Sequence, residues 1–243
     1  MTSTLKIHLL LSSSFRVNLL FINHISIDIC SSETLSSLIQ NLDSLKDKWE
    51  TDLGERISET LWQNIIRRIY SSSICLKHAV IQFKIVYRLH WTKVRLSKIK
   101  TDLDPTCDRC KQAPATLLHM FWTCPSLLSF WQSIFQTFSS ICARTVKPST
   151  LISLFGVAPT DAFFTGHQLN MIAFCCLLAR QLILFKWKDA RPPTYSQWIK
   201  EVMGHIHLEK IRYTIRGSTR KFYLTWQPFI SFVEGMAATD MSA

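Results

Sequence analysis

In the stretch CDRCKQAPATLLHMFWTC, from Cys107 to Cys124, residue type and spacing together dictate a chemistry. It contains a C-x2-C-x8-H-x4-C array, in which two thiolates can bind one tetrahedral metal from a tight turn. The histidine and the last cysteine can complete the shell from a second turn or a helix start. Four protein ligands leave no open position, which is typical of structural Zn²⁺. We therefore predict that Cys107, Cys110, His119 and Cys124 bind Zn²⁺ in a structural role.

Other cysteines and histidines do not form such a set. The chain has 8 Cys and 8 His, so accidental pairs are expected, but a complete four-ligand set in so short a segment is much rarer. Cys175 and Cys176 are adjacent in an apolar segment and are predicted to be buried. His205 and His207 lack a third ligand at a recognisable spacing. Three further cysteines are isolated: Cys30, Cys75 and Cys142.

Composition indicates a folded, basic protein. Apolar residues make up 47% of the chain and charged residues 19%, which is enough apolar content for a core. Only 6 Gly and 8 Pro argue against a turn-rich β-sandwich. A net charge of +11 favours a polyanionic partner, nucleic acid before membrane.

Neither apolar segment predicts a membrane span or a secretory signal. Residues 17–27 carry no charge but are too short for the ~20 residues that a bilayer requires. Residues 169–185 are interrupted by Arg180, so we expect a buried core helix. Without a secretory signal the thiols stay reduced, which suits metal binding. We expect the protein in the nucleus, the cytoplasm or both, without a membrane partner.

Capping residues and apolar periodicity predict a mainly α fold, a helical domain with a small Cys/His zinc-knuckle lobe in the middle. Ser58 and Thr194 stand where helix caps are expected, and Gly156 and Gly217 where helices stop. Along the helix that begins after Thr194, the residues expected to face inward are Trp198, Val202, Ile206 and Ile211. The other predicted helices cover about 31–42, 59–70, 125–138, 149–155 and 169–188, and a last one runs from Ser218 to before Pro228.

Residues 78–100 fit two patterns. Ile81, Phe83 and Ile85 begin an alternation that is typical of a strand. Basic residues also recur at helical steps of four and three. The length of the segment and its lack of Gly and Pro favour one continuous helix.

The positive charge is concentrated before the cysteine array. Residues 60–101 contain nine Lys or Arg and no Asp or Glu. On a helix, five residues would line one face, where cations bind phosphates and an exposed indole stacks on an unpaired base. We therefore expect RNA or single-stranded DNA as the partner, bound by Lys84, Arg88, Trp91, Arg95 and Lys98.

Two alternatives remain for the charged segments. The first stretch can be a solvated face with a core tryptophan, and the protein then a structural or interaction scaffold that uses zinc without binding nucleic acid. A second, weaker basic group near the C-terminus contains Lys210, Arg212, Arg216, Arg220 and Lys221. No small-molecule substrate is expected, and the pattern is silent on the oligomeric state.

The array and its flanks also resemble a known family. CDRCKQAPATLLHMFWTCPSLLSFW is similar to the zinc-binding region at the C-terminal end of reverse transcriptases encoded by LINE-type, non-LTR retrotransposons. The flanking SSSICLKHAVIQFKIVYRLHWTKVRLSKIK, LARQLILFKWKD and LEKIRYTIRGSTRKFYLTWQPF resemble those of fish elements. The resemblance covers roughly residues 45–233. It implies a mostly helical region that binds the element's RNA during target-primed reverse transcription, with the four array residues as ligands.

The resemblance also sets expectations about activity and organisation. Polymerisation requires an adjacent pair of aspartates, and the chain contains no Asp-Asp pair. No endonuclease segment is recognised either. We therefore expect no enzymatic activity from this chain, which looks like a C-terminal piece of such a protein or a decayed remnant of one. The expected division is an unassigned segment 1–44, a basic helical and zinc-binding region 45–146, a helical region 147–234 and a tail 235–243.

Overall fold

The structure, a computed structural model, describes residues 44–159 and 162–240. It separates at Glu55 into two compact units, of which the first contributes a described helix over residues 44–53. In the second unit the described residues form helices and no strands, which confirms the predicted mainly α class. Its elements are α4 (Glu59–Ser71), α5 (Leu76–Val86), α6 (Lys93–Ser97), η1 (His119–Thr123), η2 (Pro125–Leu127), α7 (Leu128–Ile141), η3 (Leu151–Phe155), α8 (Gly166–Phe185), α9 (Tyr195–Ile215) and α10 (Thr219–Asp240).

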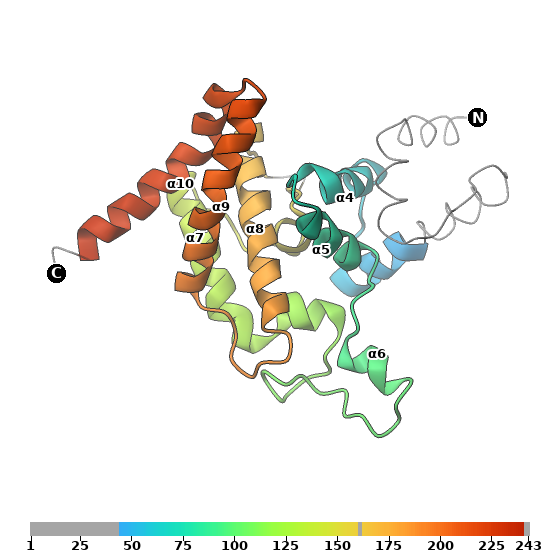
Figure 1. Cartoon of the computed structure of the whole chain (residues 1–243). Helices are drawn as coiled ribbons and strands as arrows, with labels where there is room; N and C mark the ends of the chain where they lie inside the picture. Colours follow the sequence, from blue (N-terminus) through green and yellow to red (C-terminus); the bar gives the residue numbers. More distant parts are fainter. Residues whose placement is uncertain (1–43, 160–161, 241–243) are drawn as a thin grey trace, which may run out of the picture. The chain divides into compact units, whose positions relative to one another are not determined.

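Helix α8 lies at the centre of the second unit and packs against η3, α5, α9 and α10 (Figure 1). We call α7, η3, α8, α9 and α10 the bundle. Nearly every residue from Met171 to Ile183 is buried, because neighbours surround α8 on all sides. Arg180 is fully buried as well; its guanidinium donates to the Ser153 carbonyl and to Gln82 Oε1 at 2.6 Å. These bonds connect α8 to η3 and α5, as expected for a core helix.

Among the described residues, α8 is also the one helix long and apolar enough to cross a membrane. Length and composition alone satisfy that criterion, and 72% of its most apolar window is buried inside the structure. A mostly buried core helix of a soluble protein meets the same criterion, so the finding is weak evidence for a span.

Capping residues begin the helices where the sequence predicts. The Ser58 hydroxyl accepts a hydrogen bond from the Leu61 amide at the start of α4. Thr194 and Gln197 form a capping box at the start of α9. A second capping box, formed by Thr165 and Gln168, begins α8. The predicted helix over 31–42 lies outside the described residues.

Gly156 ends η3, as predicted, in a left-handed conformation with φ of 67°. A Cβ atom at this position would lie 2.9 Å from the Cβ of Ala173 in α8. Both the backbone conformation and the close approach of α8 therefore require glycine.

The continuous helix predicted for residues 78–100 is wrong. Helix α5 ends at Val86, and Arg88 adopts a left-handed conformation with φ of 56°. The Leu89 amide donates to the Lys84 carbonyl at 2.8 Å, which closes the helix end. A new helix, α6, begins after Thr92, whose hydroxyl accepts from the Arg95 amide. The chain turns because His90 packs against Phe121 and Trp187, contacts distant in sequence.

The C-terminal prediction is also wrong in part. Helix α10 does not end before Pro228 but runs through it and through Gly235 to Asp240. Proline removes one amide donor, so the Leu224 carbonyl four residues earlier accepts no hydrogen bond from position 228. The buried side chains of Trp226 and Phe229 keep both sides of the proline packed. On α9, Ile211 is exposed and not inward, whereas the other three predicted residues are buried.

Candidate metal centre

The first two predicted ligands lie in a tight turn within residues 104–115, which we call the knuckle. An isolated bridge pairs Thr106 with Pro114, and the Cys107 amide donates to the Ala113 carbonyl at 2.9 Å. The Lys111 amide returns to the Cys107 carbonyl at 2.9 Å, and Lys111 has a φ of 55°. This backbone closes the turn from Cys107 to Cys110 and brings both sulfurs to one side.

The other two ligands lie at the two ends of η1, a π-helical turn. Five residues advance about 140° beyond a full turn in an α-helix, so His119 and Cys124 would diverge there. In a π-turn the bond joins residues five apart, and the Cys124 amide donates to the His119 carbonyl at 3.1 Å. The Thr116 hydroxyl caps the turn by accepting from the His119 amide. The π-turn thus brings the imidazole and the fourth thiol together.

Aromatic packing holds η1 against the bundle. Phe121 is fully buried and lies 5.4 Å from the Trp187 ring, measured between centroids. The indole nitrogen of Trp131 in α7 donates to the Phe121 carbonyl at 2.9 Å. The orientation of His119 and Cys124 therefore depends on the hydrophobic core as well as on the metal.

The four ligand atoms form a compact set. The three sulfurs and the imidazole nitrogen all lie within 4.8 Å of one another. The Cys107 and Cys124 sulfurs are 4.0 Å apart, and Cys110 Sγ lies 3.3 Å from His119 Nε2. Tetrahedral Zn²⁺ with ordinary bond lengths requires about 3.8 Å between sulfurs and about 3.6 Å from sulfur to nitrogen. The arrangement fits Zn²⁺ held by Cys107, Cys110, His119 and Cys124.

Local environment sets the protonation of the ligands. Burial lowers the pKa of His119, aided by the nearby positive charge of Arg109, so the imidazole is kept neutral. Burial tends to raise the pKa of Cys110, but hydrogen bonds from the Gln112 and Ala113 backbone and from the Cys107 and Cys124 side chains together outweigh it and lower the pKa. Burial raises the pKa of Cys124. Metal binding requires thiolates, so bound Zn²⁺ must displace the Cys124 proton.

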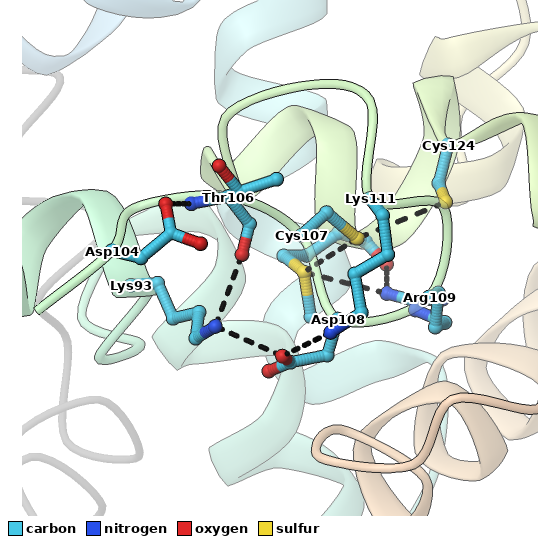
Figure 2. Close-up of polar contacts among 9 residues, drawn as sticks. Lys93, Asp104, Thr106, Cys107, Asp108, Arg109, Lys111 and Cys124 are labelled. Atoms are coloured by element: carbon cyan, nitrogen blue, oxygen red, sulfur yellow. Dashed lines mark hydrogen bonds and ion pairs between the residues drawn. The ribbon is translucent and has the colours of Figure 1, made fainter.

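A network of ion pairs joins the knuckle to α6 (Figure 2). Lys93 Nζ, at the start of α6, lies 2.9 Å from Asp108 Oδ1 and donates to the Thr106 carbonyl at 3.1 Å. Lys111 pairs with the same carboxylate oxygen at 3.0 Å. These contacts fix the basic segment that precedes the array to the turn that carries Cys107.

Sequence reasoning missed Arg109, which lies between the first two ligands. Its side chain is buried, and Nη2 donates to the Met120 carbonyl of η1. The Met120 sulfur in turn lies 3.9 Å from Cys107 Sγ. A basic residue inside the C-x2-C turn was visible in the sequence, but only the contact with Met120 reveals that it is buried.

The five residues predicted to bind nucleic acid do not share one helix face. Lys84 is exposed on α5 and Lys98 follows α6, with the turn at Arg88 between them. Within this segment, which we call the basic arm (84–98), the Arg95 guanidinium stacks 4.6 Å above the Trp91 ring and donates to the Arg88 carbonyl. Trp91 is 54% exposed, so it is not a core tryptophan.

The remaining candidates form no metal group among the described residues. Cys175 and Cys176 are fully buried, as predicted. His205 pairs with Glu201 of its own helix and lies against the His78 ring. Cys75 is exposed and Cys142 half-buried, and Cys30 lies outside the described residues.

Comparison with protein families agrees with this geometry. Residues 44–131 match the model of a family described as zinc-binding in reverse transcriptase. The match contains all four ligands, together with the basic arm and the start of α7. Residues 44–131 are thus similar to the zinc-binding region of reverse transcriptases, and the Cys/His metal group of Cys107, Cys110, His119 and Cys124 lies within the matched residues.

Proposed function

We propose that the protein binds RNA or single-stranded DNA through the basic arm, and that Zn²⁺ holds this arm in its binding conformation. The single observation that carries the proposal is the exposed Trp91 with the Arg95 guanidinium stacked on it. A flat, exposed indole can stack on an unpaired base, and a neighbouring guanidinium can bind the adjacent phosphate. We propose a binding role and no enzymatic activity for this chain.

Charge supports the same proposal. Residues 60–101 lack acidic side chains, and the exposed Lys84 and Lys98 form no ion pair within the described part of the chain. Lys93 is the exception, because it is engaged by Asp108 and serves to attach the arm to the knuckle. In this proposal zinc acts on binding indirectly, through Lys93 and Asp108.

The resemblance to LINE-type elements supports the choice of ligand. The flanking segment similar to fish elements that precedes the array includes the whole basic arm. We propose that the chain derives from such a reverse transcriptase and acts in the nucleus or cytoplasm, where its RNA ligand is found. A scaffold without nucleic-acid binding is the alternative that the following experiment separates.

The test is a titration of the full chain with a labelled single-stranded RNA at about 50 mM and about 200 mM salt. Phosphate contacts predict a steep loss of affinity with salt, and Lys98→Gln should reduce the slope by about one. Trp91→Ala should weaken binding by about 1–3 kcal/mol and leave the salt slope unchanged, because stacking involves no counterion. Lys200→Gln removes one exposed charge from α9 and serves as the matched control.

The zinc dependence needs its own variant. Replacing Cys107 and Cys110 by Ser should abolish bound zinc in native mass spectrometry and reduce RNA affinity in the same titration. If RNA affinity changes neither with salt concentration nor in Trp91→Ala, the scaffold without nucleic-acid binding is the function that remains. Unchanged zinc stoichiometry in the double variant would refute the metal site itself.

A further inference from the structure

Arg109 is a buried cation whose charge no carboxylate balances within the described part of the chain. The residue is 8% exposed. The nearest carboxylate in sequence, Asp108, is engaged by Lys93 and Lys111. Burying a guanidinium without a counter-charge is costly, so another negative group is expected beside it.

Its hydrogen bonds are also incomplete. One terminal nitrogen, Nη2, donates to the Met120 carbonyl and lies 3.6 Å from the Met120 sulfur. The other two, Nε and Nη1, are buried and have no hydrogen-bond partner among the described residues. Buried donors of this kind usually have a partner, so these two are available to an acceptor at the site.

The metal centre supplies the missing negative charge. Three thiolates, one neutral imidazole and one Zn²⁺ leave one negative charge in excess, spread over the sulfurs. The Arg109 guanidinium lies beside the site, because its Nη2 is 3.6 Å from the Met120 sulfur, which itself lies 3.9 Å from Cys107 Sγ. Zinc-bound sulfur is a hydrogen-bond acceptor, and positive groups around such centres stabilise their ligands.

We propose that Arg109 is the counter-charge of the zinc site: its guanidinium offsets the excess charge of the three thiolates and donates to them when Zn²⁺ is bound. It is a positioning residue, because it also connects the knuckle to the Met120 carbonyl of η1. It therefore joins the two halves of the site.

The test compares Arg109→Met, Arg109→Lys and Lys111→Met in the full chain. Met keeps the volume of the stem and removes the charge, whereas Lys keeps the charge. Lys111→Met removes a cation from the same turn, but its side chain is 68% exposed, so it is the matched control. Zinc affinity is measured by competition with a chromophoric chelator, and the thiolates are followed by the sulfur-to-metal charge-transfer band of the Co²⁺-loaded protein.

Arg109→Met should weaken zinc binding by about 10–100-fold, the range typical of groups that support metal ligands. The charge-transfer band should move to lower energy, because the sulfurs lose a positive neighbour and hold their electrons less tightly. Arg109→Lys should retain most of the affinity, and Lys111→Met should change it by no more than about threefold, as an exposed charge does.

A purely structural role predicts a different result. If Arg109 only fills space, Arg109→Met, which keeps the volume of the stem, would leave the band in place and the zinc affinity close to the wild-type value. Our proposal requires Arg109→Met to lose affinity that Arg109→Lys retains, with the thermal stability of the zinc-free protein unchanged, because the knuckle is then unfolded and Arg109 is solvated. An unshifted band or wild-type zinc affinity in Arg109→Met would each overturn the proposal.

Discussion

The knuckle and the bundle are held together by different forces. Between residues 104 and 115 only Cys107, Arg109 and Ala115 are buried, so the knuckle has no large apolar side chain with which to build a core. In the bundle, by contrast, aromatic side chains such as Trp198, Phe138 and Phe229 pack ring against ring. We infer that the knuckle requires a metal in order to fold, whereas burial of apolar surface suffices to stabilise the bundle.

The zinc ligands themselves come from both regions. Cys107 and Cys110 belong to the knuckle, and His119 and Cys124 flank a turn whose Phe121 is buried against Trp187. Packing of η1 against the bundle therefore helps to orient half of the ligand set, and we infer that zinc attaches the knuckle to it.

Removal of zinc should produce the largest effect. Structural zinc contributes about 10–16 kcal/mol to the folding of zinc-finger peptides, so a strong chelator should unfold the knuckle while the bundle stays helical. Hydrogen exchange followed by mass spectrometry should show loss of protection at the Cys107 and Lys111 amides, both hydrogen-bonded here. Re-addition of zinc is the control. Loss of protection throughout α8 would contradict the inference that the bundle is stable without zinc.

Truncation of a tryptophan in the bundle should lower the stability of the bundle and leave the zinc site intact. Trp198 is fully buried, and its indole nitrogen donates to the Cys175 carbonyl at 3.0 Å. Trp198→Ala should lower the free energy of unfolding by about 3–5 kcal/mol, measured by urea unfolding and circular dichroism. Zinc stoichiometry under native conditions should stay at the wild-type value, and a parallel loss of zinc would show that the two regions are not separable.

The smallest expected effect concerns the link between α6 and the knuckle. Asp108→Asn removes the charge that pairs with Lys93, but the carboxylate is 33% exposed, so the loss of stability should be about 1 kcal/mol or less. The measurable change should instead be faster hydrogen exchange in α6 of the zinc-loaded protein. Lys46, paired with Glu50 in the helix over 44–53, offers a control substitution, Lys46→Gln. Unchanged exchange in α6 would remove the proposed route from zinc to the basic arm.

Local signals explain which predictions succeeded. The ligand spacing needed only residue type and order, and the caps at Ser58 and Thr194 act within one helical turn. The helix break at Arg88 could not be foreseen in this way, because the stacking of His90 on Phe121 and Trp187 joins segments far apart in the sequence. The helix through Pro228 likewise depends on the burial of Trp226 and Phe229.

Residue types and short spacings alone specify the metal, its four ligands, the helical class and the excess of positive charge. Three features follow only from the folded chain: η1 is a π-turn, the basic arm bends at Arg88, and Arg109 is buried. Each of these three depends on packing against distant residues. Such contacts can outweigh local preference by a few kcal/mol and leave no periodic trace along the chain.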